Sequence, residues 1–241
     1  MARVRVITLD LWDTLIQEVP ERTRKMRQHR LSGMQEELDS LGFRFDFDEI
    51  ERAYHLSGDF CEQIWSRNRD MPVEDHLLFM LSCLEPSLPS RLGNDGLDKI
   101  GRVYSEALLS HPPNLYDDVI PTLSTLRKSR FKLALISNTG RTPGSVLRKL
   151  LQKMNIDQYF DFMTFSNEVM VRKPDRGIFR YTLSNMHVTP RLTAHVGDDL
   201  ETDFEGARSA GMIAIIIDRD GSAASRPDTI GSLAEIPDIF S

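Results

Sequence analysis

The sequence has 241 residues, 40% of them hydrophobic and 27% charged, and a formal net charge of −6. This balance excludes a disordered or collagen-like chain, and a chain of this length buries a sizeable core without disulfide bonds. The acidic charge gives no support for binding to nucleic acid or to an anionic membrane, and the lack of an apolar run of about 18 residues excludes a transmembrane helix. The only cysteines are Cys61 and Cys83, and charges interrupt the first apolar stretch, so the sequence predicts a cytoplasmic protein without a signal peptide.

Short apolar segments alternate with amphipathic segments over most of the chain. Residues 4–9 are rich in β-branched side chains and predict a buried strand that ends at Asp10. Further strands are expected at 132–136, 161–165, 193–197 and 212–218, with helices near 119–129, 144–154, 175–187 and 201–210. This alternation predicts an α/β fold with a doubly wound, Rossmann-like and mainly parallel sheet.

Residues 18–110 have a different pattern, without a strand of comparable quality. Apolar residues recur there at helical spacing, as at Leu77, Leu81 and Leu84. We therefore expect a helical module over 18–110, inserted into a core formed by 1–17 and 111–241.

Polar side chains gather after the predicted strands, and the carboxyl ends of parallel strands are where such sheets bind ligands. Asp10 follows the first strand, Ser137 and Asn138 the second, Lys173 stands near the third, and Asp198 follows the fourth. Carboxylate oxygens suit Mg²⁺, and a site with one or two carboxylates usually leaves room for a substrate phosphate. A serine and a lysine would then hold that phosphate, and an aspartate beside it is able to attack phosphorus.

The residues stand in the order Asp10-Leu-Trp-Asp-Thr14-Leu, Ser137-Asn-Thr, Lys173-Pro-Asp and Gly197-Asp-Asp-Leu-Glu-Thr-Asp203. This order resembles the four motifs of the haloacid dehalogenase (HAD) superfamily, over essentially the whole chain, with 18–110 in the position of the helical cap of that superfamily. Receiver domains also use acidic residues, a hydroxyl and a lysine, but in a different order.

The resemblance implies a role for each motif residue. Asp10 is the implied nucleophile, assisted by Thr14, which fixes the first loop, and by Lys173. The implied phosphate ligands are Ser137, Asn138 and Lys173. The implied ligands of Mg²⁺ are Asp10, the backbone carbonyl of Trp12, and Asp198, with Asp199 or Asp203 behind them. One of the last two carboxylates is also a candidate for capping a helix or for orienting Lys173.

One position departs from the pattern of HAD phosphatases. These enzymes usually carry a second aspartate two residues after the nucleophile, as acid and base, and here Trp12 stands in its place. Loss of a positioned acid/base typically costs about 10²–10⁴ in rate. Asp13 is a poor substitute, because adjacent side chains of an extended segment point to opposite sides.

The departure leaves a second hypothesis open. The 2-haloacid dehalogenases of the superfamily also lack that aspartate, since halide leaves without a proton. Their cap arginine has only Arg44 as a candidate here, on location alone. The basic segment Arg22–Arg30 is more typical of a solvated helix face than of a substrate-binding one, and His195 is expected to have a structural role.

The acidic cluster favours the phosphatase. We therefore expect a Mg²⁺-dependent phosphohydrolase that acts on a small phosphorylated substrate through an aspartyl-phosphate. A dehalogenase-like hydrolase and a catalytically weak HAD-fold binding protein are the alternatives. The sequence leaves the substrate and the oligomeric state open.

Overall fold

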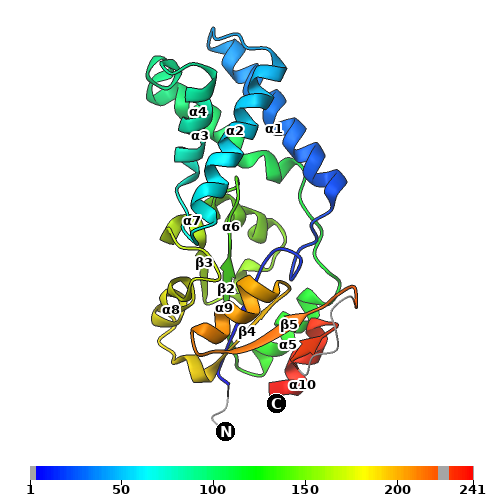
Figure 1. The fold of residues 1–241 in the computed structure, drawn as a ribbon. Helices are drawn as coiled ribbons and strands as arrows, with labels where there is room; N and C mark the ends of the chain where they lie inside the picture. Colours follow the sequence, from blue (N-terminus) through cyan, green and yellow to red (C-terminus); the bar gives the residue numbers. More distant parts are fainter. Residues whose placement is uncertain (1–3, 222–227, 241) are drawn as a thin grey trace.

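A layer of helices lies over a twisted sheet in the computed structural model, which describes residues 4–221 and 228–240 (Figure 1). Residues 1–3, 222–227 and 241 of the expected core lie outside the described residues. Within the described residues the sheet has six strands, all paired in parallel, in the order β3-β2-β1-β4-β5-β6. The strands are β1 (Val6–Leu9), β2 (Lys132–Ser137), β3 (Phe162–Phe165), β4 (Thr193–Gly197), β5 (Ile213–Ile217) and β6 (Thr229–Ile230).

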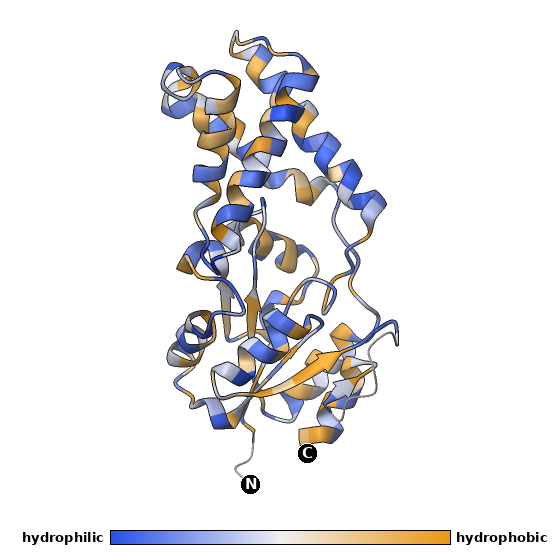
Figure 2. Ribbon diagram, in the orientation of Figure 1, coloured by the Kyte–Doolittle hydropathy of each residue, from blue (hydrophilic) through white to orange (hydrophobic). Residues whose placement is uncertain are grey.

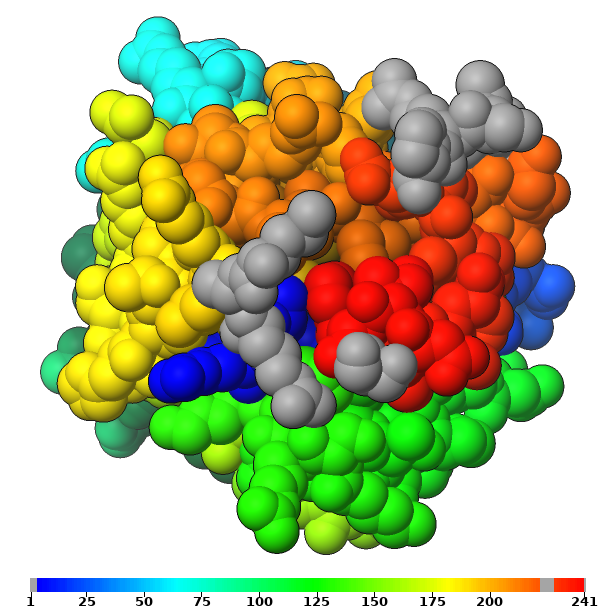
Figure 3. Space-filling model, turned by 90° about the horizontal axis from the view of Figure 1, so that it is seen from below, coloured from blue at the N-terminus to red at the C-terminus, as the bar shows by residue number. Residues whose placement is uncertain are grey.

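Helices cover both faces of the sheet, which explains why its strands are apolar on both sides. One face packs with α5 (Val119–Lys128), α6 (Gly144–Lys153) and α10 (Ile236–Phe240). The other face packs with α8 (Arg176–Asn185) and α9 (Gly206–Ser209). The doubly wound, mainly parallel fold predicted from the sequence is therefore confirmed. Figure 2 shows β5 as an apolar segment, and the view in Figure 3, from the side opposite the helical layer, shows the core segments that follow residue 110.

The strand order reverses beside β1. The chain passes from β1 to β2 and β3 on one side, and then returns to β4 on the other side of β1. Such a switch point leaves a crevice at the carboxyl ends of the two strands that flank it, and ligands of open α/β sheets bind there. Asp10 and Asp198 directly follow β1 and β4.

Residues 18–110 form α1 (Pro20–Ser40), α2 (Phe47–Trp65), α3 (Val73–Leu84) and α4 (Leu88–Ser110), the last interrupted at Gly93, where φ is 63°. Their buried apolar residues, which include Met34, Leu81, Ile100 and Tyr104, form a hydrophobic cluster of their own. Helix α1 is largely hydrophilic along its length (Figure 2). The domain boundaries stay a prediction.

The remaining elements are short: η1 (Asp157–Tyr159), α7 (Ser166–Val169), η2 (Pro190–Leu192), η3 (Leu200–Glu205) and η4 (Leu233–Glu235). The helix expected over 201–210 is in fact a π-helical turn, η3, followed by α9, because the Phe204 amide bonds to the carbonyl of Asp199 five residues earlier. Strand β6 was missed, since two residues are too few to give a periodic signal. In the part of the chain that the structure describes, no helix has both the length and the apolar character needed to cross a membrane.

Candidate active site

Asp10 lies at the carboxyl end of β1, where its backbone N–H donates to the Val196 carbonyl of β4 at 2.9 Å. Its side chain is only 7% exposed. Burial raises the pKa of Asp10 to about 7; the charge of Lys173 opposes this rise, and the carboxylates of Asp203 and Asp198 add to it. A carboxylate in this position needs a neighbouring positive charge to be ionised and nucleophilic.

Lys173 supplies a positive charge at that point. Its Nζ donates to the Asp10 carboxylate and, at 2.5 Å, to Oδ1 of Asp203. Burial acts to lower the pKa of Lys173, but the charges of Asp10 and Asp203 outweigh burial and raise it. The backbone of Lys173 is fixed by Asn138, whose Nδ2 donates to the Lys173 carbonyl at 3.0 Å and whose Oδ1 accepts the Lys173 amide at 2.8 Å. Both polar atoms of the Asn138 side chain are thus engaged, and a bond from Asn138 to phosphate stays a prediction.

Asp203 holds the Lys173 side chain in position. Besides the lysine, its carboxylate contacts His195 Nε2 at 3.0 Å and accepts the Asp199 amide at 3.2 Å. Burial acts to raise the pKa of Asp203, but Lys173 and His195 hold it below its usual range. This approach requires glycine at position 197, because a Cβ there would lie 2.2 Å from Cγ of Asp203.

His195 has the buried, structural position expected from the sequence. Its other ring nitrogen, Nδ1, lies 2.8 Å from Oγ1 of Thr8. Burial lowers its pKa, although the hydrogen bond to Asp203 opposes this. The neutral ring therefore holds the Asp203 carboxylate in place.

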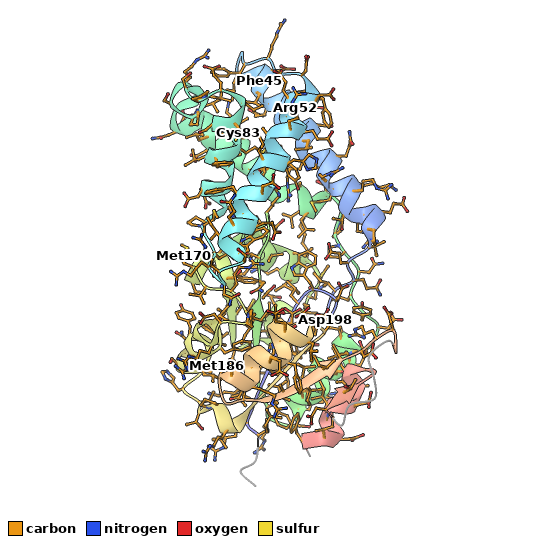
Figure 4. The ribbon with its side chains drawn as sticks, in the orientation of Figure 1. Phe45, Arg52, Cys83, Met170, Met186 and Asp198 are labelled. Atoms are coloured by element: carbon orange, nitrogen blue, oxygen red, sulfur yellow. The ribbon has the colours of Figure 1, made fainter. Side chains whose placement is uncertain are left out.

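Three carboxylates gather at the switch point. Asp10, Asp198 and Asp203 each place an oxygen within 4.8 Å of the others, and Asp198 is the exposed member. The pKa of Asp198 is raised to about 6, first by partial burial of its carboxyl group and then by repulsion from Asp203. Figure 4 shows Asp198 at the level where the core faces the helical layer. A donor set of oxygen atoms, with one member open to solvent, fits Mg²⁺ better than a softer metal.

Asp199 and Thr14 have supporting contacts around this cluster. The Asp199 carboxylate accepts the amides of Glu201 and Thr202 at 3.0 and 2.7 Å, so that it caps η3. Thr14 Oγ1 donates to Oδ1 of Asp198 at 3.3 Å. Thr14 therefore ties the first loop to the fourth motif.

In the loop that follows β1, Trp12 and Asp13 have different surroundings. Asp13 has a left-handed backbone, with φ of 51°, and its carboxylate accepts the amide of Glu18 at 2.9 Å. Trp12 is half-buried against the core. Its side chain faces a cavity of about 300 Å³ between the core loops and the helical layer. Ser137 is fully buried at the end of β2, beside β1 in the sheet.

The structure adds residues that the sequence did not single out. Asp70, between α2 and α3, accepts hydrogen bonds from Trp65, Thr139, Ser166 and Arg172. These contacts dock the helical layer on the loops that carry the second and third motifs. Thr139, Ser166 and Arg172 are distant from Asp70 in the sequence, so no local signal marks these contacts. Arg44 is exposed and precedes Phe45, which lies at the end of the helical layer far from Asp198 (Figure 4), so it does not reach the site.

A model of the haloacid dehalogenase-like hydrolase family matches residues 4–211. The chain is 32% identical over 218 residues to "Haloacid dehalogenase-like hydrolase domain-containing protein 3" of Xenopus laevis, covering 89% of the chain and 84% of the relative. It is 26% identical over 251 residues to a phosphoserine phosphatase of Thermus thermophilus, covering 97% and 98%. The matches to relatives from mouse, cattle and Methanopyrus kandleri span only 37%, 37% and 43% of those proteins.

Solved structures share the fold. A 2-haloacid dehalogenase from Pseudomonas syringae pv. Tomato superposes with a TM-score of 0.73 at 22% identity, over 98% of this chain and 97% of that one. A HAD phosphatase from Thermococcus onnurineus superposes with a TM-score of 0.65 at 24% identity, over 99% and 98%. Both likenesses establish the fold, and neither decides between the two reactions.

Proposed function

The chain belongs to the haloacid dehalogenase-like hydrolase family, and from this premise we propose that it is a Mg²⁺-dependent phosphohydrolase of a small phosphomonoester that works through an aspartyl-phosphate on Asp10. The observation that carries the proposal is the cluster of Asp10, Asp198 and Asp203 around Lys173. A site for an anionic haloacid gains nothing from three carboxylates, whereas a site for a metal and a phosphate uses them.

Asp10 acts in two steps. One of its carboxylate oxygens forms a bond to phosphorus while the bond from phosphorus to the ester oxygen breaks, and the leaving alkoxide takes a proton from water. A second water then attacks phosphorus, which releases inorganic phosphate and restores the carboxylate. Lys173 favours the ionised form of Asp10 beforehand and offsets the negative charge of the equatorial oxygens during transfer.

Asp10, Asp198 and the backbone carbonyl of Trp12 would hold the Mg²⁺. When bound, the ion supplies positive charge to the phosphoryl oxygens and offsets the repulsion among the carboxylates. Asp203 then has the positioning role, because its oxygens already accept from Lys173, His195 and the Asp199 amide. Ser137 stands at the end of β2, where its hydroxyl would donate to the phosphate.

Trp12 limits the reaction. No carboxyl group stands where the acid/base aspartate of HAD phosphatases is expected, and Asp13 is engaged with the Glu18 amide. We expect slow turnover of alkyl phosphates and faster turnover of esters with good leaving groups, since the missing proton transfer is worth about 10²–10⁴ in rate. We further propose that residues 18–110 act as a cap that excludes water and selects the substrate.

Trp12 also favours a second candidate, a dehalogenase-like hydrolase that forms an ester on Asp10. That reaction needs neither a metal nor an acid. It therefore predicts turnover of a 2-haloacid that survives a chelator.

Hydrolysis of p-nitrophenyl phosphate by metal-free protein, with and without added Mg²⁺, tests the proposal. We expect phosphate release that requires Mg²⁺ and is lost in Asp10→Asn. No turnover at saturating Mg²⁺ by folded protein would contradict it, and a 2-haloacid would be tried next.

A further inference from the structure

Three arginines border the cavity of about 300 Å³ that Trp12 and Asn138 also line. Arg30 comes from α1, Arg141 from the loop between β2 and α6, and Arg172 from the loop just before Lys173. The cavity thus begins at residues of the first two motifs, beside the third, and extends toward the helical layer.

Arg30 is buried without an acidic partner. Its side chain is 2% exposed, and its Nε donates to the Tyr104 carbonyl at 2.7 Å and its Nη2 to Thr142 Oγ1 at 3.2 Å. Both acceptors are neutral. Among the described residues no carboxylate oxygen lies within 4.0 Å of this guanidinium.

Arg141 also lacks an acidic partner, although it is only partly buried. It stacks on the ring of Tyr54 at 3.6 Å and donates to Ser57 Oγ at 2.8 Å, to the Tyr104 hydroxyl at 2.8 Å and to the Tyr54 carbonyl at 2.7 Å. These acceptors are neutral too, and within the described part of the chain Arg141 forms no ion pair. Glu18, which also lines the cavity, is exposed and contacts neither guanidinium.

Arg172 differs, because its guanidinium is paired with the buried Asp70 at 2.9 Å. The three arginines and Asp70 together leave an excess of positive charge around the cavity. His76 is consistent with this excess: its pKa is lowered to about 4, first by burial, and the charges of Arg141, Arg172 and Arg30 lower it further while Asp70 opposes them.

A guanidinium removed from water without a counter-ion is costly, and proteins normally pair it with an anion. Each guanidinium has five N–H donors in a planar fork that matches a carboxylate or a phosphate. The hydrogen bonds above use two donors of Arg30 and three of Arg141. Donors therefore remain for a bound anion.

We propose that this cavity binds a second anionic group of the substrate, through Arg30 and Arg141. The substrate class is then a small phosphomonoester that carries a carboxylate or a second phosphate, with its reacting phosphoryl group at Asp10 and its other anion beyond Trp12. The inference rests on the proposed function of the site. Because Arg30 lies in the helical layer and Arg141 in the core, the same anion would bridge the two.

Matched substrates test this proposal. Glycerol 3-phosphate and 3-phosphoglycerate differ in one group, a neutral alcohol against a carboxylate, and glycerol 1,3-bisphosphate carries a second phosphate on that same carbon instead. We expect kcat/KM for at least one of the two compounds with a second anionic group to exceed that for glycerol 3-phosphate by about 10- to 100-fold, the range for a hydrogen bond between charged groups. Whichever of the two is preferred identifies the second anion. A wild-type ratio near one for both would overturn the proposal.

Arginine variants locate the effect. Arg141→Met and Arg30→Met should remove most of the preference, and Arg141→Lys should restore part of it. Arg24→Met is the matched control, since Arg24 is exposed on the same helix as Arg30, and it should keep the wild-type ratio. A ratio unchanged in Arg141→Met would show that this arginine only ties the helical layer to the core. If Arg30→Met fails to fold, the Arg141 variants and the wild-type ratio still decide.

Binding separates this proposal from the proposed function. If the wild-type protein hydrolyses neither these compounds nor p-nitrophenyl phosphate, the proposed function fails, and calorimetric titration of the same protein with 3-phosphoglycerate, the bisphosphate and glycerol 3-phosphate replaces turnover. Tighter binding of a compound with a second anionic group than of glycerol 3-phosphate, lost in Arg141→Met, would support the cavity assignment. Equal affinity for all three would overturn it.

Discussion

Lys173→Met is the perturbation whose consequence follows most directly from the geometry. The lysine is buried between Asp10 and Asp203, and methionine keeps its length without its charge. Removing one partner of a buried ion pair typically costs about 3–5 kcal/mol, which corresponds to a fall in the melting temperature of about 10 °C for a protein of this size. We expect this loss of stability in metal-free protein, and we expect loss of phosphate release when Mg²⁺ is present.

The sign of the pH dependence is a sharper test. Burial already raises the pKa of Asp10 to about 7, and loss of the Lys173 charge removes the main influence that lowers it. A carboxyl group whose pKa is raised on folding contributes stability that is lost as the pH rises through the folded pKa. When the pH is raised from about 5.5 to about 8.5, the free energy of unfolding of Lys173→Met should therefore fall by more than that of wild type.

Thermal unfolding followed by circular dichroism in the presence of a chelator measures both effects. Lys149→Met is the matched control, because Lys149 forms an exposed ion pair with Glu106 and should cost less than about 1 kcal/mol. The reasoning is refuted if Lys173→Met is as stable as this control at both pH values.

Three further predictions concern the same site. In Gly197→Ala the new Cβ would lie 2.2 Å from Cγ of Asp203, so we expect the free energy of unfolding in urea to fall by about 1–3 kcal/mol and kcat to fall as well. Gly101→Ala is the control, because its Cβ would meet only an ordinary contact at 3.5 Å. Equal stability of the two variants would contradict the packing argument. Mg²⁺ should raise the melting temperature more at high pH than at low pH. The pKa values of Asp10 and Asp198 are raised to about 7 and about 6, and at pH values below these pKa values protons compete with the metal for the carboxylates. A rise in melting temperature that is independent of pH would count against carboxylate ligands. Trp12→Asp should raise kcat/KM for an alkyl phosphate by about 10²-fold or more while changing that for p-nitrophenyl phosphate much less, and equal changes for both would show that position 12 does not supply the proton.

Much of the fold could be predicted, because buried parallel strands have a distinctive composition. Asp10, Ser137 and Asp198 stand at the carboxyl ends of predicted strands. Because the carboxyl ends of parallel strands meet at the same edge of the sheet, these residues could be placed near one another without coordinates. The π-helical turn η3 could not be predicted, since its pattern of apolar residues is that of an ordinary helix and only the carbonyl of Asp199 distinguishes it.

The arginines show where local patterns stop being informative. A solvated face was expected for Arg22–Arg30, and Arg24 and Lys25 are indeed exposed, but the expectation is wrong for Arg30, which is buried. Its acceptors lie 74 and 112 residues away along the chain. Helical periodicity describes the face of a helix and carries no information about what packs against it.

The same limit applies to the partners of the motif residues. The second motif predicts that Asn138 binds phosphate, and no sequence pattern indicates that its amide fixes the backbone of Lys173. Asp199 and Asp203 were interchangeable in the sequence. In the structure Asp203 contacts Lys173, beside Gly197 and the ring of His195, whereas Asp199 caps η3.

The account depends most on Asp10 as the nucleophile, and trapping the covalent intermediate tests this most directly. Protein mixed with one equivalent of p-nitrophenyl phosphate and Mg²⁺ would be quenched in acid within the first turnover and digested, and its peptides analysed by mass spectrometry. We predict a phosphoryl group on the peptide that contains Asp10, absent when Mg²⁺ is left out and absent in Asp10→Asn. Phosphate release without any phosphorylated Asp10 peptide, or release that persists in Asp10→Asn, would contradict the account.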